Sequence, residues 1–298
     1  MRVFVTGATG FIGSAIVPEL INAGHQVIGL ARSDSAASQL TAAGAEVHRG
    51  DLEDLDSLRS GTAKADGVIH AGFVHDFSRL PEVCEIDRLA IETITHVLAG
   101  SDRPIIVTSG TALVSPGQLA TEDIIPVLDK KSWPRQSEQV ADAAAAKGVR
   151  AAIVRLSPSV HGEGDLHGFI PIMISIARQK GVSAYIGEGL NRWNAVHRLD
   201  AAVLFRLALE NAVAGKRFHA VGDEAIELKT IAAIIGQQLN LPVASISPEA
   251  AAEHFGWFAI MAGLDCPASG KITQESLSWH PSQAGLLSDL EQDIYFKS

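Results

Sequence analysis

Three glycines at intervals of three residues are the most informative chemical feature of this chain. Gly7, Gly10 and Gly13 lie in VFVTGATGFIGSAIVPEL, directly after an apolar run and at the start of an amphipathic one. Glycine permits the left-handed backbone of a tight turn and a close approach to the main chain, and amides at a helix N-terminus attract anions. The pattern therefore predicts a strand, a turn and a helix that bind the pyrophosphate of a dinucleotide. The same turn contributes three further expected contacts, Thr9, Phe11 and Ile12.

The end of the second apolar run indicates which dinucleotide to expect. A site specific for NAD usually has Asp or Glu here, which accepts hydrogen bonds from both ribose hydroxyls. In QVIGLARSDS the residue is Arg32, whose guanidinium can bind a 2′-phosphate with two parallel hydrogen bonds, and Ser33 is a further donor. We therefore predict NADP(H). Asp34 keeps NAD open as the alternative, and Arg32 as a solvated surface charge is the structural one.

Further cofactor contacts are expected where later strands end. Asp51 and Leu52, in GDLED, follow the third strand and can contact the adenine edge, although Asp51 or Asp54 as a helix cap is an equal alternative. Ala71 and Gly72 follow the fourth strand, where small residues let the backbone lie against the cofactor ribose. Thr108, at the end of the fifth strand, completes this set. His70 is expected to be a packed strand residue, with a catalytic role as the alternative.

The elements that must position these residues alternate regularly up to Arg155. Short β-branched runs with little polar interruption predict parallel strands that helices cover on both faces. The predicted strands are Val3–Thr6, Gln26–Leu30, Glu46–His48, Gly67–His70, Ile105–Thr108 and Ala151–Arg155. The predicted helices are Gly13–Ala23, Ser35–Ala43, Leu55–Ser60, Pro81–Leu98 and Arg135–Lys147. This alternation predicts an α/β doubly wound parallel sheet, a Rossmann fold, with residues 1–155 as the NADP(H)-binding domain.

After Arg155 the sequence changes to loops rich in Gly, Pro and His, notably SPSVHGEGDLHG. Residues 156–298 are expected to form a smaller, mixed substrate-binding lobe that is partly interleaved with the sheet, and to end in a helix from Ala284. Its other predicted elements are helices at Phe169–Gln179, Ala201–Glu210 and Leu228–Leu239 and edge strands at Val182–Ile186 and Phe218–Val221.

Composition excludes several classes of function. The 298 residues carry a formal net charge of −10 without a basic cluster, so we expect no nucleic-acid partner. No apolar run approaches the roughly 18 to 20 residues that span a bilayer, and the chain passes directly into a strand, so we expect neither a membrane partner nor a leader peptide. Cys84 and Cys266 are expected to be buried thiols, which favours the cytoplasm. We expect no metal, because no histidine pair has a ligand-like spacing, and a homodimer is compatible with the sequence.

Several motifs in order resemble one enzyme family. TGATGFIG, the Arg after the second strand, GDLED, VIHAG, VTSGT and VRLSPSVHGEG are similar to the atypical and extended short-chain dehydrogenase/reductases, the NAD(P)-dependent epimerase/dehydratase-like branch. The likeness extends from Met1 to about Asp200. It implies an active site with a Tyr, a Lys four residues later, an upstream Ser or Thr and often an Asn. It also implies that the backbone from Pro158 to Val160 meets the carboxamide of the cofactor.

The chain departs from this pattern at the Tyr and Lys. Neither is recognisable in DKKSWPRQSEQVADAAAA, and neither Tyr185 nor Tyr295 has a Lys four residues on, which fits a subgroup with an eroded active site. Three candidate catalytic residues remain. Ser109 takes the place of the upstream hydroxyl, Asp87 that of the Asn, and His161 that of an aromatic residue near the nicotinamide. The alternatives are a turn or cap for Ser109, an exposed helix carboxylate for Asp87 and a structural loop histidine for His161.

These features give one main hypothesis and two alternatives. The main one is an NADP(H)-dependent reductase that transfers hydride to a carbonyl, or a related C=N or C=C bond, of a small, partly apolar substrate. Ser109 would position the substrate, and Asp87 and His161 compete for proton handling. The alternatives are a catalytically silent NADP(H)-binding sensor or interaction protein and an epimerase or dehydratase of the sugar-nucleotide type. Trp193, Trp257 and Phe258 are expected to pack in the core, with an apolar substrate wall as the alternative.

Overall fold

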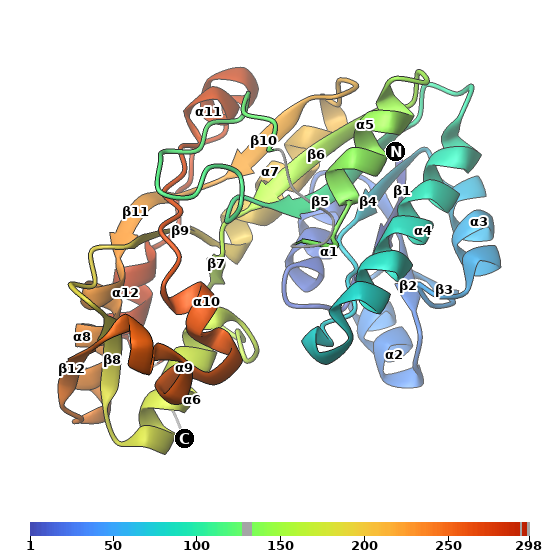
Figure 1. Cartoon of the computed structure of the whole chain (residues 1–298). Helices are drawn as coiled ribbons and strands as arrows, with labels where there is room; N and C mark the ends of the chain where they lie inside the picture. The colour runs from blue at the N-terminus through green and yellow to red at the C-terminus, as the bar shows by residue number, and fades with distance from the viewer. Residues whose placement is uncertain (127–132, 293, 297–298) are drawn as a thin grey trace. The chain divides into compact units, whose positions relative to one another are not determined.

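The chain folds into two compact units that exchange segments. The computed structural model describes residues 1–126, 133–292 and 294–296 (Figure 1). The first unit comprises Met1–Ser109, Val127–Arg155 and Ala201–Phe218, and the second comprises Gly110–Pro126, Leu156–Asp200 and His219–Ser298. A single boundary after residue 155 was expected, but Gly110–Pro126 belongs to the second unit and Ala201–Phe218 belongs to the first.

Long-range pairing accounts for both exchanged segments. The segment Gly110–Pro126 belongs to the second unit because its main chain pairs with the stretch around Ala268: the Ala120 amide donates to the Pro267 carbonyl, and the Ser269 amide donates to the Ala120 carbonyl, each at 2.9 Å. Ala201–Phe218 belongs to the first unit because it brings a strand to the edge of the main sheet. Sequence order alone does not reveal either pairing.

The first unit is built on a seven-stranded parallel sheet in the order β10-β6-β5-β4-β1-β2-β3. Its strands are β1 (Arg2–Thr6), β2 (Gln26–Ala31), β3 (Glu46–Arg49), β4 (Gly67–His70), β5 (Pro104–Gly110), β6 (Arg150–Leu156) and β10 (Arg217–Ala220). The doubly wound α/β fold is thus confirmed, and the six strands predicted up to Arg155 differ from the observed ones by at most two residues at an end. The edge strand predicted at Phe218–Val221 is β10 and lies beside β6.

The helices of the first unit cover this sheet. They are α1 (Gly13–Asn22), α2 (Asp34–Ala42), α3 (Leu55–Ala63), α4 (Leu80–Leu98), α5 (Ser137–Ala145) and α7 (Arg198–Glu210), and a short 3-10 turn, η1 (Phe77–Arg79), precedes α4. Figure 1 shows α3, α4 and α5 on one face of the sheet. Alternate strand residues, among them Phe4, Val68 and Ile105, point to this face and form a core with α4 residues such as Ile91. The helix predicted at Arg135–Lys147 is shorter than expected and begins at Ser137.

The second unit combines small sheets with short helices. Strands β7 (Ser159–His161), β9 (Arg192–His197) and β11 (Asp223–Glu227) form one sheet, and β8 (Ser183–Ile186) pairs in parallel with β12 (Val243–Ile246). The helical elements are α6 (Phe169–Lys180), α8 (Leu228–Leu239), η2 (Pro248–Ala250), α9 (Ala251–Phe255), η3 (Gly256–Phe258), α10 (Ala259–Ala262), α11 (Lys271–Leu277) and α12 (Leu286–Glu291).

Two of the three aromatic residues expected to pack in the core of this unit do so. Trp193 and Phe258 are both fully buried, with ring centroids 6.1 Å apart, and Phe169 packs against both rings. Core packing is therefore the role of these two residues, whereas Trp257 is 59% exposed. Among the helices of the described ranges, none is long and apolar enough to cross a membrane.

Candidate functional site

The glycine turn after β1 is too tight for side chains at two of its positions. Gly7 has φ +66°, in the left-handed region, and a Cβ atom there would lie 2.7 Å from the carbonyl oxygen of Ala71. The Gly7 carbonyl accepts a 2.9 Å hydrogen bond from the Gly10 amide, and a Cβ atom on Gly13 would lie 2.0 Å from the same oxygen. Contacts this short exclude alanine without movement of the backbone. The sequence spacing therefore corresponds to a physical requirement.

This turn lies where the order of strands reverses. Strands β2 and β3 follow β1 on one side, and β4 and β5 lie on the other, so the point between β1 and β4 is the topological switch point, where open α/β sheets bind ligands. A Cβ atom on Gly72, after β4, would lie 3.1 Å from the Gly7 nitrogen. Helix α1 begins at Gly13 without a side-chain cap. Uncapped amides beside a side-chain-free cradle fit a pyrophosphate group. Between the glycines lie three half-buried residues, Thr9, Phe11 and Ile12.

A cavity of about 460 Å³ opens at the ends of β2 and β3. Its lining residues are Ala31, Arg32, Arg49, Gly50, Asp51 and Asp54. Arg32 thus lies in a cavity beside the expected cofactor path, and Ser33 caps α2 by accepting a 3.1 Å hydrogen bond from the Ala36 amide. The second guanidinium, that of Arg49, was not expected from the sequence. It forms an ion pair with Asp34, the carboxylate that had kept NAD open.

The aspartates of GDLED both line this cavity and stabilise the next turn. Asp54 caps α3, because its Oδ1 accepts a 3.2 Å hydrogen bond from the Ser57 amide. Asp51 Oδ1 accepts one of 3.0 Å from the Glu53 amide. The two interpretations of these carboxylates are therefore compatible. Leu52 reaches toward the glycines, since its Cδ1 would be 3.3 Å from a Cβ atom on Gly72.

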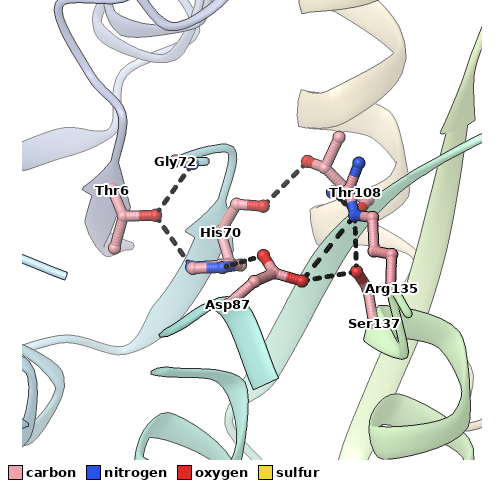
Figure 2. Close-up of polar contacts among 7 residues, drawn as sticks. All are labelled: Thr6, His70, Gly72, Asp87, Thr108, Arg135 and Ser137. Carbon is pink, nitrogen blue, oxygen red and sulfur yellow. Dashed lines mark hydrogen bonds and ion pairs between the residues drawn. The ribbon is translucent and has the colours of Figure 1, made fainter. Parts of the chain in front are cut away.

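A buried polar network connects the end of β1 with β4, α4 and the start of α5 (Figure 2). Thr6 Oγ1 accepts a 3.1 Å hydrogen bond from the Gly72 amide and lies 2.9 Å from His70 Nδ1. His70 Nε2 lies 3.2 Å from Asp87 Oδ1, and the Ser137 hydroxyl donates to Asp87 Oδ2 at 2.6 Å. All four side chains are at most 2% exposed. The chain of contacts therefore runs without solvent from the cofactor turn to α5.

The ionisation of Asp87 determines which groups of this network donate hydrogen bonds and which accept them. Burial raises the pKa of its carboxyl, but the hydrogen bond from His70, the charge of Arg135 and the bond from Ser137 together hold the pKa below its usual value. An ionised carboxylate only accepts hydrogen bonds, so His70 Nε2 must donate, and in the neutral imidazole Nδ1 then accepts from the Thr6 hydroxyl. Asp87 is thus a buried group whose contacts pass through neighbours, not an exposed helix carboxylate.

Thr108 and Ser109 make different contacts at the end of β5. The Thr108 hydroxyl donates to the His70 carbonyl at 2.8 Å, while its own carbonyl accepts a 3.0 Å hydrogen bond from Arg135 (Figure 2). The Ser109 hydroxyl bonds the Glu138 carboxylate. Thr108 therefore belongs to the network around Asp87, and Ser109 to a second cluster.

Glu138 is the centre of that second cluster. It is buried and forms a bidentate pair with the fully buried Arg155, at 2.7 and 2.8 Å, and a further pair with Arg217 at 3.3 Å. Burial raises the pKa of Glu138, and the hydrogen bond and charge of Arg155, with the bond from Ser109, more than reverse this, so its pKa lies below the usual value. Ser109 thus lies at the end of β5 in contact with this cluster.

His161 and its neighbours belong to the second unit. Pro158 and Val160 are half-buried beside it, and His161, in β7, is fully buried with Nδ1 2.6 Å from Asp289 Oδ2. Its Nε2 has no hydrogen-bond partner within the described part of the chain. The contact with α12 is what a structural histidine would make. No group of three metal-binding side chains is assembled among residues 1–126, 133–292 and 294–296.

The structure thus gathers most expected residues of the first unit along one sheet edge. The turn from Gly7 to Gly13, together with Gly72, lies at the switch point, Arg32 and Asp51 line the cavity, and Thr108 and Ser109 lie in the last part of β5. Of the stretch DKKSWPRQSEQVADAAAA, residues 129–132 lie outside the described residues, and the remainder forms α5 and its approach. Sequence reasoning missed four site residues, Thr6, Arg49, Arg135 and Ser137. For Thr6 and Arg49, the position at the end of a parallel strand was a signal in the sequence. For Arg135 and Ser137 there was no such signal.

Comparisons with known proteins give the family. The chain is 52% identical to an uncharacterized protein of Schizosaccharomyces pombe, over 99% of this chain and 100% of that one. It is 26% identical, over 90% of its length and 84% of the relative, to the 4-hydroxy-2-methyl-3-oxo-4-farnesyl-3,4-dihydroquinoline-1-oxide ketoreductase of Stigmatella aurantiaca. Its fold is similar to that of DesIV, a dTDP-glucose 4,6-dehydratase from Streptomyces venezuelae with NAD and TYD bound, with a TM-score of 0.77, 19% identity and coverage of 99% and 96% of the two chains.

A family model adds the decisive match. The NAD dependent epimerase/dehydratase family model matches residues 3–221, which include the glycine turn, the whole seven-stranded sheet and both polar clusters. Members of this family bind nicotinamide cofactors, as the uncapped glycine turn at the switch point leads one to expect. The chain belongs to the NAD dependent epimerase/dehydratase family.

Proposed function

We propose that this protein is an NADP(H)-dependent reductase that transfers hydride to a carbonyl, or a related C=N or C=C bond, of a small, partly apolar substrate. The observation that carries the proposal is the cavity at the ends of β2 and β3, which is lined by two guanidiniums, those of Arg32 and Arg49. A 2′-phosphate is a dianion that matches such a pair. The relatedness to a ketoreductase, an enzyme named for reduction of a ketone, supports the reductase direction.

The charges around this cavity favour NADP(H) over NAD. An NAD site would offer a free carboxylate to the ribose hydroxyls. Here Asp34 is paired with Arg49, and one carboxylate oxygen each of Asp51 and Asp54 accepts a hydrogen bond from a backbone amide. Arg32, by contrast, is exposed next to the cavity. Arg32 is thus a cation of this lining without a hydrogen bond or ion pair to the residues that the structure describes.

Charge-reversal variants test the cofactor preference. A charge-assisted hydrogen bond contributes about 1.5–3 kcal/mol, so Arg32→Glu or Arg49→Glu should weaken NADPH binding about 10- to 150-fold while NADH binding stays the same or improves. Arg59→Glu is the matched control, because the Arg59 side chain is 52% exposed, against 53% for Arg49, and lies outside the cavity. Fluorescence titration gives both dissociation constants. An unchanged preference for NADPH in both cavity variants contradicts the proposed 2′-phosphate site.

Turnover separates the reductase from the silent sensor. Oxidation of NADPH is followed by the loss of its absorbance with a panel of aldehydes, ketones and imines. Consumption above the substrate-free rate supports the reductase. Tight NADPH binding without turnover on the whole panel contradicts it and supports a sensor that has kept the cofactor site and lost the reaction.

We also propose that the protein acts in the cytoplasm. Cys84 and Cys266 are both free and buried, as predicted from the sequence. Burial raises the pKa of both thiols, that of Cys266 to about 12, so they are poor nucleophiles. Two inert, unpaired thiols suit a reducing compartment.

A further inference from the structure

A partly exposed guanidinium is held rigidly at the carboxyl end of β5. The Arg135 side chain is 24% exposed, and its Cζ lies 4.4 Å from the centroid of the Phe73 ring. Its Nε donates to the Ser137 hydroxyl at 2.9 Å, and one terminal nitrogen donates to the Thr108 carbonyl at 3.0 Å (Figure 2). Contacts on two edges and one face fix the orientation of the planar group.

Some N–H donors of Arg135 have no partner in the part of the chain that the structure describes. A guanidinium carries five N–H groups. The other terminal nitrogen has no hydrogen bond or ion pair within the described residues. Asp87 supplies a counter-charge without using these donors, because its Oδ2 lies 3.7 Å from Arg135 Nε and takes its hydrogen bond from Ser137. The cation is therefore stabilised from the buried side, while its outer donors have no partner among residues 1–126, 133–292 and 294–296.

The position of Arg135 corresponds to the reacting half of the cofactor. A dinucleotide that crosses the switch point with its phosphorylated ribose near Arg32 has its other half over β4 and β5. Arg135 lies in this region, because it donates a hydrogen bond to the carbonyl of Thr108 in the last part of β5. The first unit contains no tyrosine, because Tyr185 and Tyr295 both belong to the second. Within the unit that builds the cofactor site, Arg135 is thus a suitably placed group for a substrate oxygen.

We propose that Arg135 binds the carbonyl oxygen of the substrate and stabilises the negative charge that develops on it during reduction. This inference rests on the proposed reductase function. When bound, a reduced nicotinamide supplies a hydride. As the carbonyl carbon forms its new C–H bond, the π pair of the C=O bond moves to oxygen, and the N–H donors of Arg135 stabilise the alkoxide. A water molecule then protonates the alkoxide and leaves hydroxide, because a guanidinium stays protonated in proteins. The carbonyl is reduced to an alcohol and the cofactor is oxidised.

A binding experiment tests this role without turnover. Isobutyrate is a small, partly apolar carboxylate that carries negative charge on oxygen, as the alkoxide does. We expect it to bind the complex of the protein with NADP⁺ and to change the tryptophan fluorescence. Arg135→Ala should weaken isobutyrate binding at least 10-fold and alter NADP⁺ affinity less than threefold. Arg88→Ala is the matched control, since the Arg88 side chain is also 24% exposed but pairs with Glu85 and Glu92 on the surface of α4.

Activity gives a second, independent readout. Removal of one donor to an oxyanion lowers kcat about 10²- to 10³-fold, and we expect a loss of this size for Arg135→Ala on the best carbonyl substrate. Added guanidinium chloride at millimolar concentration should restore at least 10-fold of that loss, whereas ethylammonium should not. A merely structural arginine would not be replaced by a free guanidinium ion. Circular dichroism and thermal unfolding of the variant show whether it is folded.

Asp87 is a positioning residue in this scheme. Asp87→Asn should weaken isobutyrate binding when Arg135 is present, and should have no further effect in Arg135→Ala, because the carboxylate acts through the guanidinium. Such non-additivity in a double-mutant cycle is not expected of two independent losses of stability.

The outcomes separate the inference from the proposed function. Failure of wild type to bind isobutyrate at tens of millimolar, or unchanged binding in a folded Arg135→Ala, overturns the role of Arg135. Wild-type turnover that survives in Arg135→Ala also overturns it and leaves the reductase intact. Isobutyrate binding that depends on Arg135, in a protein without NADPH turnover, supports the oxyanion site and contradicts the reductase.

Discussion

Alanine at position 13 should separate cofactor binding from folding. A Cβ atom on Gly13 would lie 2.0 Å from the Gly7 carbonyl oxygen and 2.9 Å from Ala8 Cα, whereas ordinary contacts begin at 3.4 Å. The turn must therefore open by more than 1 Å, because both neighbours are backbone. Overpacking destabilises by about 1–3 kcal/mol, and the better helix propensity of alanine offsets up to about 1 kcal/mol of this. Displacing two amide–phosphate hydrogen bonds, each about 1.5 kcal/mol or more, should weaken NADPH binding about 100-fold.

Gly61→Ala is the control for this prediction. Gly61 is also a helical glycine, in α3, and a Cβ atom there would lie 2.5 Å from Cζ of the buried Phe4 ring. Gly61→Ala should lower the unfolding temperature about as much as Gly13→Ala does, and it should change the dissociation constant of NADPH less than threefold. Fluorescence titration and thermal unfolding measure the two effects. If folded Gly13→Ala binds NADPH as wild type does, or if Gly61→Ala loses affinity equally, the turn is not the pyrophosphate site.

Three further predictions concern stability. Glu138 has a pKa below its ordinary value of 4.5, so its ionised form stabilises the fold above pH 4.5, and this contribution is lost as the pH falls through the lowered pKa. In urea unfolding, Glu138→Gln should be about 3–5 kcal/mol less stable at pH 7, and its stability should depend less on pH below 4.5. An unchanged pH dependence of stability below 4.5 would contradict this role of Glu138. Asp289→Ala leaves the buried His161 Nδ1 without its partner and should lower the free energy of unfolding by about 1–3 kcal/mol, which equilibrium denaturation checks. Phe258→Ala should destabilise by about 3–5 kcal/mol and the 79% exposed Ile260→Ala by less than about 0.5 kcal/mol; similar losses in the two would contradict the core assignment.

Local sequence patterns were enough to predict six strands of the seven-stranded sheet and the glycine turn. β-branched runs bounded by turn residues specify parallel strands, and Gly7 and Gly13 meet steric demands within one seven-residue segment. The second unit was harder, because its sheets depend on distant pairings. Strand β11, for example, pairs with β9 across an irregularity between Asp223 and Ile226, and no periodicity in either strand specifies that register.

The candidate site was predicted where it depends on one element and missed where it depends on two. Arg32 follows directly from the end of β2. Arg49 enters the same cavity because it pairs in register with Ala31, and register between neighbouring strands cannot be read from either one. The position of Asp87 on a helix was predicted, but its burial depends on His70 and Ser137, which come from β4 and α5.

The late arrival of β10 affects how the protein is made. During synthesis all other strands of the seven-stranded sheet leave the ribosome before Arg217 does, so β6 has an unpaired edge until then. At roughly 5–20 residues per second, the nascent chain exposes these amide and carbonyl groups for several seconds, and an open strand edge invites pairing with another chain. Nascent chains stalled before residue 217 should therefore depend strongly on ribosome-associated chaperones, and those stalled well beyond it much less.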